Sequence, residues 1–565
     1  MKSLVATQLL ESIQRLHAQG MWPGTDWTAT ELLLAGLVEQ IETPDVKTHG
    51  DYSSPVALRL AKVLRASPLI LAKQIAEDVM RPSRSTQVFE KVEVAAPGFL
   101  NFFLTSGALV TTVTEILEQD KKYGSTDLFK GQKILVEFIS ANPTGPLTFA
   151  NGRGGFTGDV LVNLLKVLGA KAQREYYVND RGVQIETLAE SVIRRWLIDQ
   201  GMKVDFPENL YQGEYISDLV KALKLDTHTK TSVQELTKLK AGLKTKALKH
   251  MLKDIQRVIT DKMGIKFDEY FSEASLYKTG EIQEMLSFLK EAELVYEQDG
   301  ATWMRTTNFG DDKDRVLVKS DGETTYFLSD VAYHWNKFHV RKYTWAINLL
   351  GADHHGYIGR LKAAVEALSR AGQFKEKPRM DILIMQMVRL MKNGEEVRMS
   401  KRKGQFITIE EVIDEVGIDA VRFFFLMYAS NTHMDFDLQL AKEKNEKNPV
   451  YYVQYAHARI SSILKQIKKA PTVTQIDLHA EAELALAKHL LQYPDLLKQM
   501  GQDFGVHALP QYSIEVARLF HAFYAKCRVI EDEKVNPSRY ALIRATQIVL
   551  RNALSMMGIS APKSM

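Results

Sequence analysis

Hydrophobic and polar residues alternate with several different periods along the chain, and the clearest succession of elements lies between residues 134 and 178. The apolar run ILVEFI, which begins at Ile134, is typical of a buried strand. A turn rich in proline and glycine follows it, then a helical period over 154–168 and a second strand-like run over 172–178. A strand, a helix and a strand in this order predict a βαβ unit, and therefore a parallel, doubly wound sheet.

The rest of the pattern predicts a multidomain α/β protein. Residues 1–110 mix helical and strand-like signals, which indicates a small α+β domain. A central α/β domain is expected over 131–440, with a lysine-rich helical insertion at about 185–265. Residues 441–565 have a helical signal with no strand-like alternation, so an all-α domain is expected. The lysines of the insertion favour a solvated helix face, with a nucleic-acid contact as the alternative.

Composition narrows the class of protein. The 565 residues are 45% hydrophobic and 25% charged, as in globular chains of several domains. The single cysteine, Cys527, rules out an intramolecular disulfide and a thiolate metal cluster, and a cytoplasmic location is expected. The sequence has no apolar run of about 18 residues, so no contact with a membrane is expected. The net charge of +4 is too small to indicate a partner.

The turn after Ile134 and the helix that follows it suit a nucleotide. A glycine-rich helix start offers free backbone N–H groups and the positive end of a helix dipole to phosphate oxygens. One interpretation is a dinucleotide fingerprint, with Glu175 as the acid that binds the ribose. The glycine spacing argues against it, because the third glycine of that motif would fall at Thr157. The preceding NPTGP turn, at 142–146, also has no place in that motif.

A second nucleotide signal lies far downstream. The polar segment VRMSKRKG, at 397–404, follows the apolar run ILIMQMV at 382–388. Cations flanked by glycine, such as Lys401 and Arg402, suit the charge that develops on a triphosphate during reaction. A basic segment alone is usually only solvated, but its pairing with the first signal on a doubly wound sheet makes a nucleotide site the better interpretation.

These segments together resemble the class I aminoacyl-tRNA synthetases, and most closely the arginyl-tRNA synthetases. SANPTGP at 140–146, GRG at 152–154 and MSKRKG at 399–404 are similar to the two ATP-site motifs of that family. YYVNDRGVQ at 176–184 and segments near both ends, such as NPVYYVQYAHARI, also resemble it. The resemblance covers nearly the whole chain. It implies a class I Rossmann-type catalytic domain, an N-terminal domain that binds the tRNA elbow, and a C-terminal anticodon-binding bundle.

An arginine-specific pocket needs carboxylates, because paired hydrogen bonds to a planar guanidinium distinguish arginine from lysine. In FDEYFSEASL, Glu273 matches the family's acidic pocket residue, and Tyr326 and Asp330 are four residues apart, on one face of a helix that begins there. The resemblance further implies that Asn142 holds the α-amino end of the substrate. The expected arginine-binding residues are Ser140, Asn142, Gln184, Glu273, Tyr326 and Asp330.

The sequence departs from the family at one place. Where the family has His-Val-Gly-His, this chain has Thr148, Phe149, Ala150 and Asn151. Asn151 keeps a neutral donor of similar reach, whereas Thr148 is shorter and reaches a phosphate only through water or a closer approach. Loss of one transition-state hydrogen bond typically costs about 2.7–4 kcal/mol. The chain is therefore either a working synthetase with a substituted site, which we favour, or a catalytically impaired protein that binds tRNA or arginine.

The resemblance implies ATP-dependent ligation of L-arginine to tRNA(Arg) through arginyl-adenylate. The cofactors are ATP and Mg²⁺ that comes with the nucleotide, no protein-held metal is expected, and a monomer is expected. The expected catalytic residues are Thr148, Asn151, Ser400, Lys401 and Arg402. The expected ATP-binding residues are Pro143, Gly145, Thr148, Asn151, Gly152, Gly351, Asp353, Met387, Val388, Met399 and Lys401. The expected tRNA-binding residues are Asn101, Phe103, Tyr452, Tyr455, His457 and Arg459, although core packing is an equal alternative for each.

Overall fold

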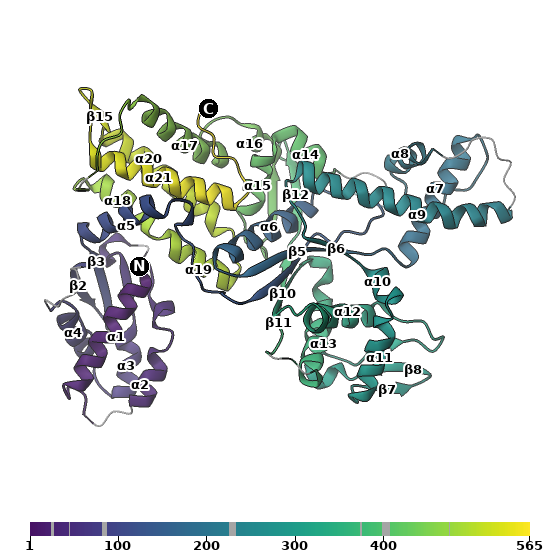
Figure 1. Ribbon diagram of the computed structural model, residues 1–565, viewed down its shortest axis with the longest axis horizontal. Helices are drawn as coiled ribbons and strands as arrows, with labels where there is room; N and C mark the ends of the chain where they lie inside the picture. Colours follow the sequence, from purple (N-terminus) through teal and green to yellow (C-terminus); the bar gives the residue numbers. More distant parts are fainter. Residues whose placement is uncertain are drawn as a thin grey trace.

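The computed structural model describes residues 1–23, 27–44, 46–81, 88–224, 233–372, 374, 376–397, 407–473 and 475–565. Among these residues, none of the helices combines the length and the apolar character needed to cross a bilayer. Figure 1 shows an N-terminal unit, a C-terminal group of helices beside it, and a central unit from which a long helical projection extends. The C-terminal helices lie between the other two units, and ion pairs such as Asp51–Lys488 connect them to the N-terminal unit.

A five-stranded sheet forms the centre of the molecule. Its strands are β4 (Lys133–Glu137), β5 (Lys171–Val178), β6 (Glu269–Ser272), β10 (Trp345–Gly351) and β11 (Arg379–Met385). They lie in the order β11-β10-β4-β5-β6, and every neighbouring pair is parallel. The predicted parallel, doubly wound sheet is therefore confirmed. Its order reverses between β4 and β10, and ligands of such sheets bind outside the carboxyl ends of the strands at this switch point.

Helix α6 (Asn151–Val167) connects β4 to β5 and lies very close to the sheet. It begins three residues before the start that the periodicity predicts. A Cβ atom on Gly158 would come 2.4 Å from the ring of Phe138, and one on Gly155 would come 2.7 Å from Met263. These glycines therefore allow the helix to approach the sheet and its neighbours, rather than serving only a phosphate.

The helical insertion projects from the sheet (Figure 1) and has a core of its own. It contains α7 (Val183–Asp199), α8 (Glu214–Leu223) and α9 (Val233–Arg257), and a short π-helical turn, Val258–Lys262, follows α9. Lys240 and Lys244 form ion pairs with glutamates on α7. These two lysines therefore belong to the internal structure of the insertion.

A second inserted unit follows β6, and the sequence pattern did not indicate it. It includes a three-stranded antiparallel sheet in the order β7-β8-β9 and packs against α12 and α13 around a separate apolar cluster. Its elements and neighbours are α10 (Glu273–Lys278), α11 (Glu281–Glu291), β7 (Val295–Gln298), β8 (Ala301–Met304), β9 (Arg315–Val318), α12 (Tyr326–Trp335) and α13 (Ile358–Ala371).

The N-terminal unit is an α+β structure in which helices cover an antiparallel sheet of order β1-β3-β2. Its elements are α1 (Lys2–Ala18), α2 (Trp27–Leu34), β1 (Tyr52–Ser54), α3 (Val56–Leu64), α4 (Pro68–Val79), β2 (Phe89–Ala95), β3 (Phe99–Leu104) and the connecting α5 (Ser106–Gln119). Downstream of β11, a small sheet of order β13-β12-β14 contains β12 (Val388–Lys392), β13 (Glu395–Glu396) and β14 (Met434–Asp437), with α14 (Ile409–Val416), α15 (Ile418–Leu426) and α16 (Leu438–Lys442) beside it.

The C-terminal part is a helical bundle, as expected, although a short hairpin corrects the prediction that no strand occurs there. The hairpin strands β15 (Ile530–Glu531) and β16 (Lys534–Val535) join the last two helices. The helices are α17 (Pro449–Gln466), α18 (Glu481–Leu491), α19 (Tyr493–Asp503), α20 (Ala508–Lys526) and α21 (Pro537–Met556).

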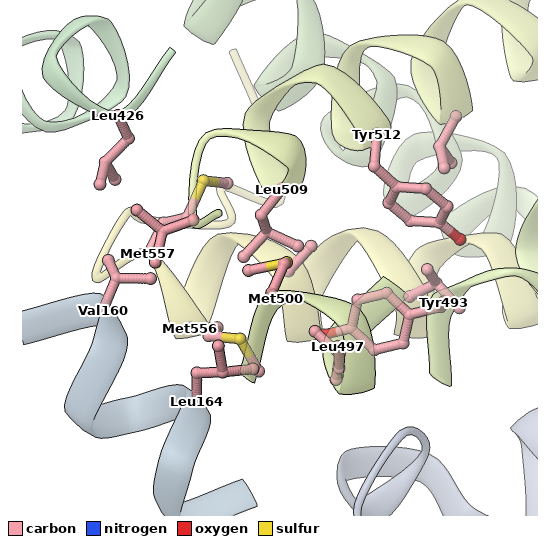
Figure 2. Packing of buried hydrophobic residues seen from close by; sticks show 14 of the residues in the cluster. Val160, Leu164, Leu426, Tyr493, Leu497, Met500, Leu509, Tyr512, Met556 and Met557 are labelled. Atoms are coloured by element: carbon pink, nitrogen blue, oxygen red, sulfur yellow. The ribbon is translucent and has the colours of Figure 1, made fainter. Parts of the chain in front are cut away.

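The bundle packs directly on α6. Figure 2 shows Val160 and Leu164 of α6 beside Met556 and Met557 at the end of α21, and all four are buried. The buried guanidinium of Arg422, on α15, forms an ion pair with Asp159 of α6 and donates to the backbone carbonyl oxygen of Met557 at 3.1 Å. The helix that starts at the switch point is therefore held from its far side by the C-terminal domain.

Close packing of α6 predicts opposite effects for two glycine-to-alanine changes. Gly158→Ala places a methyl group against the Phe138 ring, so we expect a destabilisation of about 1–3 kcal/mol and a lower melting temperature. Gly154→Ala is the matched control, because its Cβ would lie 3.7 Å from Met385, an ordinary contact, and alanine favours a helix. Thermal unfolding measures both. Equal melting temperatures for the two variants would contradict this role of Gly158.

Candidate active site

A sharp bend after β4 places the first polar groups at the switch point. Ile139 and Ser140 have φ values of 67° and 39°, a left-handed conformation that side chains other than glycine adopt at a cost of about 1–3 kcal/mol each. The Ser140 hydroxyl oxygen accepts a hydrogen bond from the backbone N–H of Tyr177 at 3.1 Å. Beyond the bend, the Asn142 side-chain oxygen accepts one from Asn179 at 2.8 Å. Two predicted arginine-binding residues thus lie between the ends of β4 and β5.

Glu273, Tyr326 and Asp330 lie on two helices that begin near the switch point. Glu273 opens α10 directly after β6, and only 3% of its surface is exposed. Tyr326 opens α12 and is 60% exposed, and Asp330 follows one turn later. A Cβ on Gly182, whose φ is 86°, would come 2.7 Å from the Tyr326 hydroxyl. The Tyr326 hydroxyl therefore lies against the residue that precedes α7, and Gln184, with an exposed side chain, is in the first turn of that helix.

The electrostatics of this group favour a cationic ligand. Burial, together with the nearby carboxylates of Glu137 and Glu273, raises the pKa of Asp330 to about 8, while the cations of Lys337 and Arg360 oppose the shift. Burial also raises the pKa of Glu273. Carboxylates that are desolvated and close together gain most from a partner with a delocalised positive charge. A guanidinium is such a partner.

A buried network supports these acids from below. Lys337 is fully buried, and its ammonium donates to Glu137 at 2.6 Å and to Asn348 at 3.2 Å. Glu175 is also fully buried, accepts from the Tyr333 hydroxyl at 2.5 Å and forms an ion pair with Arg341. Glu175 therefore belongs to the core, which excludes it as the ribose acid of a dinucleotide site.

Thr148 and Asn151, which stand where the family has its two histidines, form a hydrogen-bonded pair. Both the hydroxyl and the backbone N–H of Thr148 donate to the side-chain oxygen of Asn151, each at 2.9 Å. Since the amide oxygen is engaged in this way, the amide nitrogen of Asn151 is left as the donor of the pair. Thr148 is buried and orients Asn151, while a direct contact between Thr148 and ATP stays a prediction.

The start of α6 is less open than the sequence indicates. The backbone N–H groups of Asn151, Gly152 and Arg153 donate to the carbonyls three residues earlier, at 2.9, 3.0 and 3.3 Å. The expectation of free N–H groups at these three positions is therefore wrong, because the chain tightens into short turns before the helix proper. The amide nitrogen of Asn151 is a side-chain donor that this helix end still offers.

Arg153 is a functional candidate that the sequence analysis missed. Its side chain is buried and its guanidinium donates to backbone carbonyls of two separate segments: to Gln386 at 2.9 Å, to Ala429 at 2.7 Å and to Thr432 at 2.5 Å. It thereby fixes the bend between β11 and β12, which carries Met387. The arginine of the GRG segment was the available signal.

Of the other predicted ATP-binding residues, those that the structure describes lie near the carboxyl ends of β4, β10 and β11. Gly351 ends β10, and a Cβ there would come 2.6 Å from the carboxylate of Asp353, which is exposed. Met387 is 67% exposed beside the buried Val388. Pro143 is buried in the NPTGP turn at 142–146, and Gly145 lies two residues later in the same turn. The predicted residues Met399, Ser400, Lys401 and Arg402 lie outside the described residues.

The predicted tRNA-binding residues divide into two groups. On α17, the Arg459 guanidinium donates to the Tyr455 hydroxyl at 2.9 Å, and the rings of Tyr452 and Tyr455 lie against His521, so these three share an aromatic and basic surface. His457 lies on another face, is buried, and has Nδ1 2.7 Å from the carbonyl oxygen of Pro562.

In the N-terminal sheet, Asn101 is likewise buried, and its side-chain oxygen accepts from Ser53 at 2.8 Å. Phe103 is half-buried beneath the Lys91 ammonium, which lies 4.2 Å from the ring centroid. The contacts of Asn101 and His457 are therefore within the fold, which favours for these two residues the alternative of core packing.

The raised pKa of Asp330 predicts a pH dependence of arginine binding. Below about pH 8 the carboxyl group holds a proton that a guanidinium must displace, so affinity increases as the pH rises through this value and levels off above it. We expect the KM for arginine to fall up to about tenfold between about pH 7 and pH 9. Steady-state kinetics measure it, with the KM for ATP as internal control. Asp330→Asn should weaken binding and flatten the profile; an unchanged profile in this variant would contradict the assignment.

The contacts of Arg153 predict a specific loss of ATP affinity. Arg153→Lys cannot span both segments and leaves buried carbonyls unpaired, so the KM for ATP should rise roughly tenfold, with a smaller change in the KM for arginine. Arg389→Lys is the matched control on β12, because Arg389 forms an exposed ion pair with Asp435 that lysine can keep. A lower melting temperature with unchanged KM for ATP would show that Arg153 serves stability alone.

Comparison with known proteins gives one consistent result. The description "tRNA synthetases class I (R), catalytic domain" matches residues 112–433, "Arginyl tRNA synthetase N terminal domain" matches 29–104, and "DALR anticodon binding domain" matches 453–565. The arginine–tRNA ligase 1 of Halalkalibacterium halodurans is 41% identical over 98% of both chains. The arginine–tRNA ligase of Bacillus subtilis is 42% identical over 94% of this chain and 97% of its own. In structure, the Thermus thermophilus arginyl-tRNA synthetase has a TM-score of 0.72 and 22% identity, covering 95% of this chain and all of that one, a likeness of fold.

Proposed function

Because this chain belongs to the class I arginyl-tRNA synthetases and is an arginine–tRNA ligase, we propose how its switch-point residues carry out the reaction. The carboxylate of arginine attacks the α-phosphate of ATP, which releases pyrophosphate and forms arginyl-adenylate. The terminal ribose of tRNA(Arg) then takes the arginyl group. The reaction needs no nucleophile from the protein, since positioning and charge stabilisation provide the rate.

The arginine side chain lies between Glu273 and Asp330, against the exposed ring of Tyr326. The observation that carries this assignment is the pair of desolvated acids at the starts of α10 and α12. A cation between them lowers both pKa values, and a guanidinium has enough N–H donors to pair with both carboxylates. Asn142 and Ser140 hold the α-amino end. Gln184 completes the rim from the first turn of α7, beside Tyr326.

ATP lies across the ends of β4 and β10, with Asn151 donating to a phosphate and Thr148 orienting Asn151. Lys401, Ser400 and Arg402 act on the phosphates from the basic segment, and Met387, Val388, Met399, Gly351 and Asp353 hold the adenosine. The donor that this pair leaves near the start of α6 is the neutral amide nitrogen of Asn151, which fits a phosphate oxygen rather than a cation. Mg²⁺ would therefore enter with ATP rather than through protein ligands, and it would supply positive charge against that of the phosphates.

The proposal extends to the tRNA-binding surface, the domain bounds, the oligomeric state and the location of the chain. tRNA(Arg) contacts the surface formed by Tyr452, Tyr455 and Arg459, and Phe103 contributes at the N-terminal unit. The domains are 1–110, 131–440 with an insertion at about 185–265, and 441–565. The chain acts as a monomer in the cytoplasm. The unpaired, buried Cys527 supports this location, because chains of oxidising compartments generally use their cysteines in disulfides.

Arginine-dependent ATP–pyrophosphate exchange, with and without tRNA(Arg), tests this function. We expect exchange when tRNA is present. Retained tRNA binding without exchange would instead support the alternative, a catalytically impaired synthetase-like binding protein, and exchange with another amino acid would contradict the pocket assignment.

The Thr148–Asn151 pair predicts a non-additive set of variants. Asn151→Ala removes the donor and should lower the exchange rate by about 10²-fold. Thr148→Val removes only one of the two bonds that orient Asn151, so we expect a loss of about tenfold or less. If Thr148 acts through Asn151, the double variant is no slower than Asn151→Ala alone. Losses that multiply would show that Thr148 contacts ATP independently.

A further inference from the structure

The helical insertion directly contacts the NPTGP turn, residues 142–146, of the proposed ATP site. Tyr215, on α8, donates its hydroxyl hydrogen bond to the backbone carbonyl oxygen of Thr144 at 3.0 Å. The next residue, Gly145, has no side chain, and a Cβ there would come 3.3 Å from the Tyr215 hydroxyl oxygen. The Tyr215 ring packs against the apolar core of the insertion. One aromatic side chain thus connects that core to the turn between β4 and α6.

The other end of the insertion contacts α14, the helix that follows the basic segment in the chain. Figure 1 shows α9 running from the outer helices of the insertion back to α14. There, the two terminal nitrogens of Arg257 donate to the two carboxylate oxygens of Glu410 at 2.9 and 2.8 Å. Lys262, in the following π-helical turn, donates to Asp414 at 2.7 Å. Glu410 and Asp414 both lie on α14.

The beginning of α14 is in turn hydrogen-bonded to residues 147–149, just before α6. The backbone N–H of Phe149 donates to the carbonyl of Ile407 at 3.0 Å, and that of Ile409 donates to the carbonyl of Leu147 at 3.1 Å. Thr148, the residue that orients Asn151, lies at the centre of this short antiparallel bridge with Thr408. The insertion is therefore connected to both sides of the residue pair that replaces the family's histidines.

We propose that the insertion positions the ATP site, with Tyr215 and Arg257 as its two positioning residues. Tyr215 holds the turn that precedes the signature residues, and Arg257 holds the helix that pairs with them. The inference rests on the ATP use proposed above and gives the insertion a part in it. The charged residues of the insertion then have different roles: Lys240 and Lys244 pair within it, whereas Arg257 reaches across to α14.

The first experiment removes the hydroxyl of Tyr215 and measures exchange kinetics with tRNA(Arg) present. Tyr215→Phe should raise the KM for ATP about fivefold, as expected for one lost hydrogen bond, with the KM for arginine changed less than about twofold and an unchanged melting temperature. Tyr211→Phe is the matched control, since Tyr211 packs on the same core four residues earlier. We expect its KM for ATP to equal that of the unchanged protein.

The second experiment removes the charge of Arg257. Arg257→Gln should raise the KM for ATP about twofold to threefold at low salt, and the difference should shrink as salt screens the exposed pair in the unchanged protein. Lys240→Gln is the control, because it removes an ion pair with Glu190 that lies within the insertion.

The proposal requires both effects. It is overturned if either variant has the same KM for ATP as its control, or if both KM values and the melting temperature change together, which would indicate a structural role only. The proposed function is tested separately: a chain with no arginine-dependent exchange before any substitution contradicts the function itself.

Discussion

The close approach of α6 to the central sheet is the constraint on which the site depends. A helix with larger residues at Gly155 and Gly158 would have to move outward from Phe138 and Met263, and its first turn would move with it. That first turn carries Asn151 at the switch point and Arg153 beneath it. Helix α6 also packs against the C-terminal domain through Val160. The position of this one helix therefore sets the position of the nucleotide site relative to the anticodon-binding bundle.

Electrostatics divide the switch point into two halves of opposite character. On the side of β6 and α12, burial raises the pKa values of Glu273 and Asp330, so a guanidinium bound there would stabilise their ionised forms. At the start of α6, the donor that the Thr148–Asn151 pair leaves is a neutral amide nitrogen, at a position where the family carries a histidine. The buried ion pair of Lys337 and Glu137 lies beneath the acidic half and keeps part of its charge balanced.

The sequence predicts the parts of this structure that have a strong period or a motif. The βαβ unit around Ile134 follows from an apolar run that only Glu137 interrupts. Tyr326 and Asp330 follow from the resemblance to the arginyl-tRNA synthetases, and their four-residue spacing adds that they share one face of a helix. The sheet β7-β8-β9 was missed because strands of four residues with charged neighbours leave no clear period. The contacts of Arg153 were also out of reach, because a sequence does not show which carbonyls a buried arginine satisfies. His457 illustrates a different limit: it lies two residues from both Tyr455 and Arg459, and residues two apart on a helix face different ways.

The claim that most needs a direct measurement is that Asn151, oriented by Thr148, takes the place of a signature histidine at the phosphates. A crystal structure of the chain with a non-hydrolysable arginyl-adenylate analogue and tRNA(Arg) provides that measurement. The account predicts the amide nitrogen of Asn151 within about 3.2 Å of an oxygen in the group that replaces the phosphate, with the Thr148 bond retained. An Asn151 side chain more than about 4 Å from that group, with no water between them, would contradict it.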